Sequence, residues 1–314
     1  MATPTISAVV TAYNCESFIS EALASILGQS EPPLEVIVVN DGSTDRTAAA
    51  IAEHGGSIKV VEQENAGHAC ALNRGFAMAR GDYVAKCDAD DVWEPEKLAW
   101  QRRLLRSHPQ VDIACGSASY FGTARGLRAP HSRSGVLESR QLMRDLFAAN
   151  FICASTTLVR RTLYEALGPF DERLRAEDYD FWLRALAAGA VFAYDPRVLV
   201  RYRCHGANVS SDKLCMHQAE LSVHRRHAAS VQALGQDRTL LVRRTLARDL
   251  RNIGRALYDR NELGGARDAF VKSLRALPST RALVWAALLS LPGRSWTAVA
   301  DSLISIRRIA RDLR

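Results

Sequence analysis

Three aspartates occupy four consecutive positions in the segment Asp88-Ala89-Asp90-Asp91, shortly after the apolar run Tyr83-Val84-Ala85. Carboxylates this close repel one another, and the repulsion raises their pKa values unless a cation or hydrogen-bond donors compensate the charge. Divalent cations such as Mg²⁺ prefer oxygen ligands, and the hydroxyl groups of a ligand are the alternative partners. The segment therefore predicts a site for a cation or for a hydroxyl-rich ligand where a buried strand ends.

Other polar segments follow apolar runs in the same way. Thr11-Ala12-Tyr13-Asn14 follows the run 6–10, and Asn40-Asp41-Gly42-Ser43-Thr44-Asp45 follows the next run along the chain. Taken alone, the second segment is a turn with a helix N-cap, and the aspartates at 88–91 are a cap for a helix that begins near Pro95. A cap needs only one carboxylate, so polar segments at successive strand ends favour a binding site.

The elements that must position these residues alternate between two kinds of segment. Short runs rich in branched residues are separated by segments with helical spacing. This alternation, with little polar character inside the runs, predicts a mostly parallel sheet that is buried on both faces and binds ligands at the carboxyl ends of its strands. The expected strands are 6–10, 35–39, 58–61 and 83–85, and the expected helices are 17–28, 45–54 and 67–80.

A second acidic pair, Glu177-Asp178, precedes a segment whose apolar residues have helical spacing, so the pair opens a helix. One interpretation is that it complements the helix dipole, and the other is that it supplies a catalytic base. The dipole alone lowers a carboxylate's pKa, whereas partial burial in a closed site raises it again. Trp182 on the same helix either packs in the core or stacks on the apolar face of a ligand.

Seven segments together resemble the family 2 glycosyltransferases of the GT-A fold, over residues 5 to about 210. The resemblance implies a Rossmann-like sheet flanked by helices and a nucleotide-diphosphate sugar, UDP-linked, as donor. It also implies a divalent metal, Mn²⁺ or Mg²⁺, and transfer of the sugar to an acceptor hydroxyl with inversion. The matching segments are VVTAYN (9–14), VVNDGSTD (38–45), ENAGHACALNRG (64–75), CDADD (87–91), GPFDERL (168–174), AEDYDFWLR (176–184) and YRCHGANVS (202–210).

The resemblance places the donor on the first four of these segments. A carboxylate at Asp41 can accept the imide N–H of a base while Tyr13 covers a ring face. Gly67 opens a helix whose N-terminus, with Arg74, faces the ribose or phosphates, or is an ordinary helix start with a surface arginine. The expected nucleotide-sugar-binding residues are Thr11, Ala12, Tyr13, Asp41, Asn73, Arg74, Asp88 and Ala89.

The remaining roles concern the metal and the acceptor. By the same resemblance, Asp90 is the metal ligand and Asp178 is the general base, with Glu177 orienting the base or the acceptor. His205 either completes the metal shell or is structural. The closing arginine-tryptophan pair of processive polysaccharide synthases is missing, as are their transmembrane helices, so transfer of one sugar or a few per encounter is expected.

Two further function classes fit parts of the sequence. The segment Asp88-Ala89-Asp90-Asp91-Val92 matches the DxDxV nucleophile loop of haloacid-dehalogenase-type phosphatases. That loop normally ends the first strand, however, and here three strands precede it. The other class is a catalytically silent nucleotide-sugar-binding module that works through a helical tail. Intact Asp41, Asp90 and Asp178 argue against it.

The expected catalytic domain is 1–211, and 212–314 is expected to be helical. Residues 238–276 have the spacing of a single tetratricopeptide-type hairpin.

The positive charge of the chain is concentrated near its end. From Asp237 onward there are 16 Lys and Arg against 7 Asp and Glu, a net charge of +9, whereas the preceding residues carry −2. No helix-turn-helix, zinc finger or aromatic-lined basic groove accompanies this charge, so nucleic acid is not an expected partner. Residues 282–314 predict a helix on an anionic membrane, or else a solvated basic face.

The composition of the chain indicates its class and its expected location. The chain has 314 residues, 47% of them hydrophobic and 24% charged, which is typical of a soluble globular protein. Seven cysteines without a CxxC pair predict reduced thiols in the cytoplasm. No signal peptide is expected, and the longest apolar stretch, Ala282 to Leu291, is too short to cross a bilayer. We therefore expect a cytoplasmic enzyme at the inner membrane face, with a glycan or lipid-linked acceptor in cell-surface polysaccharide synthesis.

Overall fold

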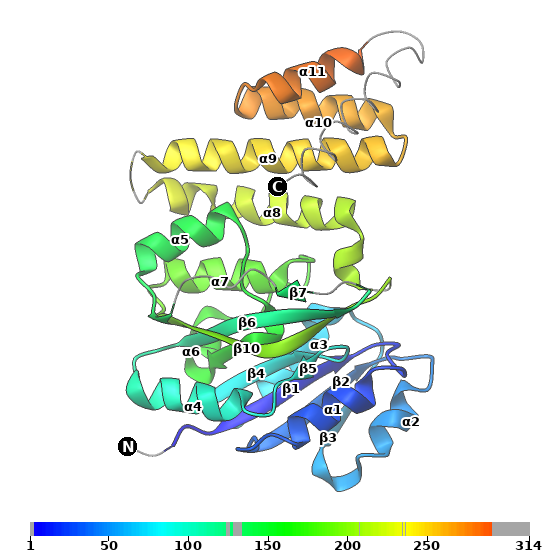
Figure 1. Ribbon diagram of the computed structural model, residues 1–314, viewed down its shortest axis with the longest axis vertical. Coiled ribbons are helices and arrows are strands. Elements are labelled where there is room, and N and C mark those ends of the chain that lie inside the picture. The colour runs from blue at the N-terminus through cyan, green and yellow to red at the C-terminus, as the bar shows by residue number, and fades with distance from the viewer. Residues whose placement is uncertain are drawn as a thin grey trace. The chain divides into compact units, whose positions relative to one another are not determined.

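The structure, a computed structural model, divides into two units by its internal contacts, Met1–Ser211 and Asp212–Arg314. The described part of the first unit is a mixed β-sheet with its helices, and that of the second is helical (Figure 1). The structure describes residues 3–123, 126–127, 134–206, 208–233, 235 and 237–290.

The first four strands are parallel, and the first, second and fourth are mostly buried. β1 (Ile6–Ala12) is buried at all seven positions, and β2 (Glu35–Asp41) at six of seven. β3 (Lys59–Gln63) pairs with β2, and β4 (Tyr83–Asp88) pairs with β1 on the other side, which gives the order β3-β2-β1-β4. The predicted strands are confirmed, and each continues two or three residues further at its carboxyl end. The first polar residues after each run therefore still belong to the sheet.

Three helices cross over between these strands: α1 (Ile19–Leu27), α2 (Thr47–Ala52) and α3 (His68–Met78). Helix α3 approaches β1 closely because Gly75 has no side chain. A Cβ atom there would lie 2.3 Å from Cγ1 of Val9. This close packing holds the first turn of α3 at the carboxyl ends of the strands.

The other half of the sheet contains antiparallel pairs. β9 (Leu158–Arg160) is antiparallel to both β4 and β6 (Ile113–Gly122), and β10 (Phe192–Cys204) runs parallel to β6. The sheet is therefore mixed, and the expectation of a mostly parallel sheet holds for its first four strands. β9 is too short to show a periodic pattern in the sequence. The remaining strands are β5 (Val92–Trp93), β7 (Gly126–Leu127) and β8 (Gly135–Val136).

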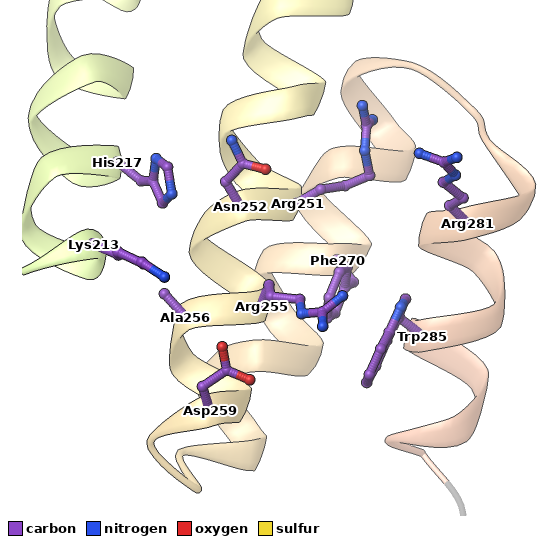
Figure 2. Close-up of a pocket in the computed structure, with 10 residues that line it drawn as sticks. All are labelled: Lys213, His217, Arg251, Asn252, Arg255, Ala256, Asp259, Phe270, Arg281 and Trp285. Carbon is purple, nitrogen blue, oxygen red and sulfur yellow. The ribbon is translucent and has the colours of Figure 1, made fainter. Parts of the chain in front are cut away.

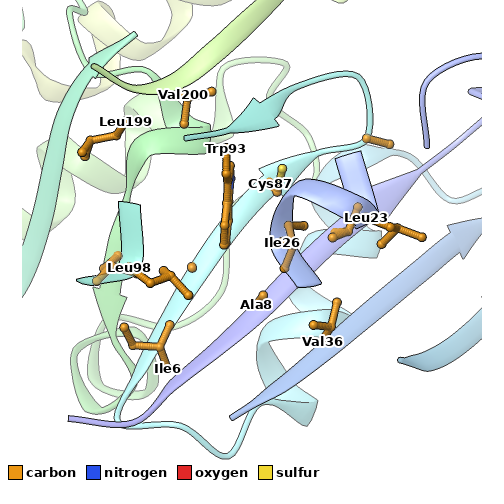
Figure 3. Close-up of a cluster of buried hydrophobic side chains, with 14 of the residues drawn as sticks. Ile6, Ala8, Leu23, Ile26, Val36, Cys87, Trp93, Leu98, Leu199 and Val200 are labelled. Carbon is orange, nitrogen blue, oxygen red and sulfur yellow. The ribbon is translucent and has the colours of Figure 1, made fainter. Parts of the chain in front are cut away.

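A continuous apolar core fills one side of this sheet (Figure 3). Ile6 from β1 and Leu23 from α1 are fully buried there, and Trp93 is 2% exposed. Trp182 is 1% exposed, which confirms the core interpretation over sugar stacking. The other helices of this unit are α4 (Lys97–Ser107), α5 (Ser139–Ala148), α6 (Arg161–Leu167) and α7 (Glu177–Ala187), with the short 3₁₀ helices η1 (Gly55–Ser57), η2 (Ala154–Thr156) and η3 (Val209–Ser211).

The second unit is built from helices joined by short connections. The predicted hairpin is present, with Asn261 at φ 63° in the turn between its two helices. Phe270, Trp285 and Ala266 form part of a separate apolar core. Residues 291–314, which include most of the predicted membrane segment, lie outside the described residues. The helices are α8 (Lys213–Gln232), α9 (Asp237–Asp259), α10 (Leu263–Ala276) and α11 (Thr280–Leu288).

Helix α11 begins the predicted membrane segment and packs by one face. Ala282, Trp285 and Ala286 are buried, whereas Leu283 and Val284 are exposed. No helix in the described ranges has the length and apolar character needed to span a bilayer. All seven cysteines are free thiols, as expected.

Candidate active site

The segment Asp88–Asp91, here called the acidic turn, follows β4 and is closed by a hydrogen bond from the Asp91 backbone N–H to the Asp88 carbonyl (3.0 Å). Asp90 Oδ2 lies 3.0 Å from His205 Nε2 and accepts a bond from Asn208 Nδ2 at 3.0 Å. The predicted metal ligands Asp90 and His205 are therefore in direct contact, although 115 residues separate them in sequence.

The acidic turn carries more negative charge than its immediate partners relieve. Burial, followed by repulsion from Asp88, raises the pKa of Asp90. Burial raises the pKa of Asp91 well above its ordinary value, with Asp88 and Asp90 adding to the effect. Asp91 Oδ1 accepts a bond from the Arg203 backbone N–H (3.0 Å), but its buried Oδ2 has no hydrogen-bond partner among the described residues. A cation at this turn would lower these pKa values.

The donor set of the turn suits Mg²⁺ or Mn²⁺ in part. Asp90 offers carboxylate oxygen, which these cations prefer, and His205 offers a ring nitrogen. Within the described ranges, no three His, Cys, Asp or Glu side chains are grouped so as to hold a metal ion. A metal held by Asp90 and His205 would therefore take its remaining ligands from a diphosphate and water.

The pair Glu177 and Asp178, here called the carboxylate pair, opens α7 as predicted, but its members have different environments. Glu177 is 5% exposed, and burial, followed by repulsion from Asp178, raises its pKa to about 8. Asp178 is half-buried, and its Oδ1 accepts a bond from the Tyr179 backbone N–H at 2.7 Å. Near neutral pH, Glu177 therefore holds a proton and can donate a hydrogen bond.

Lys86 interacts with both the acidic turn and the carboxylate pair, although no role was predicted for it. Its Nζ lies 3.3 Å from Asp88 Oδ1, and the residue is 5% exposed. Burial opposes the charge of the ammonium, but Asp88, Asp178 and Glu177 outweigh burial and raise its pKa. A lysine inside the apolar run of β4 was the signal that could have identified it, because an unpaired buried lysine is rare.

His68 was also missed, although it lies inside the quoted segment 64–75. Its Nδ1 lies 3.3 Å from Thr11 Oγ1, and its Nε2 lies 3.4 Å from Glu177 Oε1 and 3.6 Å from Asp88 Oδ1. The side chain is 40% exposed. Partial burial of the ring, and then the Lys86 charge, lowers the pKa of His68, so the neutral ring is favoured. Its position directly after Gly67, where α3 begins, was the available signal.

Residues from four segments thus converge at the carboxyl ends of the strands. Thr11 of β1 pairs in register with Asp88 of β4, and His68 of α3 and Glu177 of α7 lie next to them. Ser155 also belongs to this group, since it donates from Oγ to Asp88 Oδ2 (3.3 Å) and accepts the Asp88 backbone N–H (3.2 Å). Ala89, which follows in the turn, is 6% exposed.

The predicted base-binding residues present a more closed arrangement. The Asp41 carboxylate accepts bonds from Gln63 Nε2 (2.7 Å), the Ala66 N–H (2.8 Å) and the Gly67 N–H (3.0 Å). An ionised carboxylate has about four acceptor positions, so about one remains for a ligand. Tyr13 is 50% exposed and available for stacking, and Ala12 beside it is buried.

Asn73 and Arg74 lie on α3, beyond its first turn. The Asn73 amide makes four hydrogen bonds: it donates to the Phe170 carbonyl (2.9 Å) and Glu172 Oε1 (3.0 Å), and accepts from the Phe170 N–H (2.9 Å) and the Tyr164 hydroxyl (3.1 Å). These bonds fill the capacity of the amide. Asn73 therefore anchors the segment that leads into α7 and does not turn toward the acidic turn. Arg74 is exposed.

Comparison with known proteins identifies the family of the chain. The sequence profile of glycosyl transferase family 2 matches residues 7–168. An uncharacterized glycosyltransferase of Rickettsia typhi is 30% identical over 219 residues, which is 67% of each chain.

Two solved structures show the same fold. Staphylococcus aureus TarS 1–349 in complex with UDP-GlcNAc superposes with a TM-score of 0.65 at 19% identity, and the match covers 91% of this chain and 86% of that one. Mannosyltransferase PcManGT of Pyrobaculum calidifontis, in complex with GDP-Man and Mn²⁺, gives a TM-score of 0.62 at 22% identity and covers 97% and 86%. The chain spans half of the longer TarS chain.

These neighbours and the mixed sheet confirm the predicted GT-A fold. The haloacid-dehalogenase-type alternative therefore gives way to the glycosyltransferase interpretation. Segments that lie far apart in the sequence meet at one end of the sheet. The chain belongs to glycosyl transferase family 2.

Proposed function

We propose that this protein transfers a single sugar from a UDP-linked donor to an acceptor hydroxyl, with inversion at the anomeric carbon. The observation that carries the proposal is the position of the buried Lys86, which lies 3.3 Å from Asp88 of the acidic turn and within electrostatic range of Glu177 and Asp178 of the carboxylate pair. It makes the acidic turn and the carboxylate pair one site, in which the first can bind a nucleotide diphosphate and the second can activate an acceptor. The TarS complex with UDP-GlcNAc supports a UDP-linked donor.

In this proposal Asp178 is the general base. Its carboxylate takes the proton of the acceptor hydroxyl while that oxygen attacks C1 of the donor sugar, and the bond between C1 and the diphosphate oxygen breaks. The diphosphate leaves with the bonding electron pair, and attack from the opposite face inverts C1. The bond from the Tyr179 N–H to Asp178 Oδ1 orients the carboxylate. Protonated Glu177 can donate to an acceptor oxygen and position it.

The donor side is proposed to lie on the acidic turn and the ends of β1 and β2. Asp88 contacts the nucleotide, while Asp90 and His205 hold a divalent cation. That cation supplies charge neutralisation for the departing diphosphate. Tyr13 stacks on the base, and the remaining acceptor position of Asp41 receives its N–H. The PcManGT complex with Mn²⁺ supports the choice of metal.

The test is a transfer and hydrolysis assay with radiolabelled UDP-sugars and GDP-sugars, with Mn²⁺ or with EDTA. We expect UDP release that depends on Mn²⁺ and a labelled product when extracts rich in lipid-linked glycans are added. Release from GDP-sugars alone would overturn the nucleotide assignment. Mn²⁺-dependent donor binding without any turnover would instead establish the silent binding module.

The proposed acceptor is a lipid-linked glycan at the cytoplasmic face of an anionic membrane, within cell-surface polysaccharide synthesis. The net charge of +9 from Asp237 onward supports this, since each Lys or Arg near an anionic surface contributes about 1 kcal/mol. We expect the protein to sediment with anionic liposomes at low ionic strength and to be released by salt. The role of the tail in this attachment is tested by truncating the chain after Ser290. The cut is not made earlier, because residues 282–286 help to form the core of the second unit. A protein that ignores such liposomes at low salt points to a soluble acceptor.

A further inference from the structure

A pocket of about 330 Å³ lies within the second unit, between α8, α9, α10 and α11 (Figure 2). It is independent of the proposed glycosyl transfer, whose residues all belong to the first unit. Its volume falls in the range of small-molecule sites. This cavity is here called the basic pocket. The residues that line it are Lys213 and His217 from α8, Arg251, Asn252, Arg255, Ala256 and Asp259 from α9, Phe270 from α10, and Arg281 and Trp285 from α11.

The charge of the basic pocket is only partly compensated. Four of its lining residues are Lys or Arg and one is Asp, so the lining has a net charge of +3 with His217 neutral. Within the part of the chain that the structure describes, none of these four cations is within 4 Å of a carboxylate. Other arginines of the same unit are paired, as Arg248 is with Asp249 and Arg260 is with Asp212.

The arginines of the pocket also repel one another. Arg251 and Arg255 lie one helical turn apart on α9, a spacing at which like charges destabilise a helix. In Figure 2 the side chains of Arg251 and Arg281 extend toward each other from α9 and α11. Burial, followed by the charges of Arg281 and Arg248, lowers the pKa of Arg251. An anion bound between these groups would replace repulsion with attraction.

Aromatic side chains stiffen one wall of the pocket. Phe270 and Trp285 stack with their ring centroids 5.4 Å apart and their planes at 12°, and the Arg255 guanidinium lies 6.0 Å from the Trp285 ring centroid. A guanidinium held by such a wall presents its planar donors in a fixed direction, which suits the oxygens of phosphate.

We propose that the basic pocket binds a phosphate-bearing group with at least two negative charges. Such a group belongs either to a soluble phosphorylated compound or to the headgroup of an anionic lipid. Both sources offer the same chemistry to the three arginines and Lys213.

The experiment titrates the full-length protein with sodium pyrophosphate in a calorimeter, at constant ionic strength and with EDTA present. Arg251→Gln/Arg281→Gln should weaken binding at least tenfold. The matched control Arg225→Gln/Arg275→Gln removes the same charge from exposed positions outside the pocket and should change binding less than twofold. Arg281→Gln alone alters an exposed side chain and keeps the test valid if the double variant unfolds. No binding by the wild type, or equal losses in both double variants, would overturn the proposal.

Two further experiments determine where the anion binds and whether it comes from a lipid headgroup or from a soluble compound. Asp90→Asn should leave pyrophosphate binding intact, so loss of binding in that variant alone would place the anion in the first unit and refute the proposal. Vesicles of phosphatidate with phosphatidylcholine then replace pyrophosphate. Weaker sedimentation of Arg251→Gln/Arg281→Gln relative to its control assigns the pocket to a lipid headgroup, whereas equal sedimentation with a loss of pyrophosphate binding assigns it to a soluble phosphate.

Discussion

The acidic turn of the first unit and the basic pocket of the second both concentrate charge of one sign, but only in the acidic turn do described side chains within ion-pair distance relieve part of that charge. Asp88 is met by Lys86 and Ser155, Asp90 by His205 and Asn208. In the basic pocket no described carboxylate lies within ion-pair distance of the four cations.

This difference separates two ways of building a site for a charged ligand. Internal counter-charges fix the geometry of the acidic turn before a ligand binds, which is the preorganisation that catalysis requires. A pocket whose cations have no described carboxylate within ion-pair distance keeps more of its attraction for an anion. The variants below test this contrast, from the largest expected effect to the smallest.

Asp90→Asn should abolish glycosyl transfer and the metal-dependent part of nucleotide-diphosphate affinity, because it removes the carboxylate ligand of the proposed metal site. Calorimetry with UDP, with and without Mn²⁺, together with the transfer assay, measures both. Asp268→Asn, whose side chain is 62% exposed on the second unit, is the matched control. Wild-type metal dependence in Asp90→Asn would refute the role of Asp90.

Asp178→Asn should lower the turnover number by roughly 10²–10⁴-fold, the range for a positioned general base, while donor affinity is retained. Single-turnover kinetics at saturating donor measure the chemical step. The comparison variant is Glu177→Gln, which preserves the hydrogen-bonding capacity of a protonated glutamic acid and should cost much less. If the two variants exchange their effects, Glu177 is the base.

Lys86→Met should lower the free energy of unfolding by about 3–5 kcal/mol, because removing one partner of a buried ion pair leaves an uncompensated buried charge. Denaturant titration measures the loss. Lys97 is a suitable contrast, because it is fully buried with no carboxylate partner among the residues that the structure describes, and burial lowers its pKa to about 7. Lys97→Met should cost less, about 1–3 kcal/mol, mainly through the hydrogen bond to Gln101. Equal costs would show that Lys86 does not balance the carboxylates.

Gly75→Ala should lower the free energy of unfolding by about 1–3 kcal/mol, because the new Cβ would overlap Val9 and force α3 away from β1. Gly264 of α10 has open space around its Cβ position, so Gly264→Ala should be neutral or stabilising by up to about 1 kcal/mol. Thermal unfolding of the two variants compares packing in the two units. A neutral Gly75→Ala would mean that α3 can shift without cost.

The last prediction concerns pH. Burial raises the pKa of Glu177 from 4.5 to about 8, so the folded protein binds more protons here than the unfolded chain between these values. The contribution of this group to stability is present below about pH 4.5 and is lost as the pH rises toward 8. Glu177→Gln should flatten that decline, as measured by denaturant titration across this window. The charged and titratable neighbours of the Glu177 carboxyl remain in the variant, and they are Asp178, Lys86, Asp88 and His68. An unchanged slope would assign the decline to another residue.

The sequence was sufficient to predict the parallel half of the sheet, because β1, β2 and β4 each contain a short apolar run that is rich in branched or aromatic residues. The antiparallel half was not predictable in the same way. β9 has three residues and β5 has two, too few for a period, and they are strands because neighbouring strands pair with them.

The candidate site was predictable at Asp90, His205, Glu177 and Asp178, where residue type and motif agree, although their roles stay predictions. The contributions of Lys86 and His68 depend on distances to residues far along the chain, which spacing does not reveal. Asn73 shows the reverse case. Its motif position indicated a ligand contact, and its amide is instead saturated by bonds to residues 164–172.

These bonds of Asn73 have a kinetic consequence. They fasten α3, which begins at the donor side with His68, to the segment that runs into α7 and the proposed base. A donor that displaces α3 would carry the start of α7 with it, so the affinity for the acceptor would depend on whether the donor is bound. Such substrate synergy would appear as an ordered pattern in two-substrate inhibition studies, and weakening the Asn73 anchor would convert it to random order.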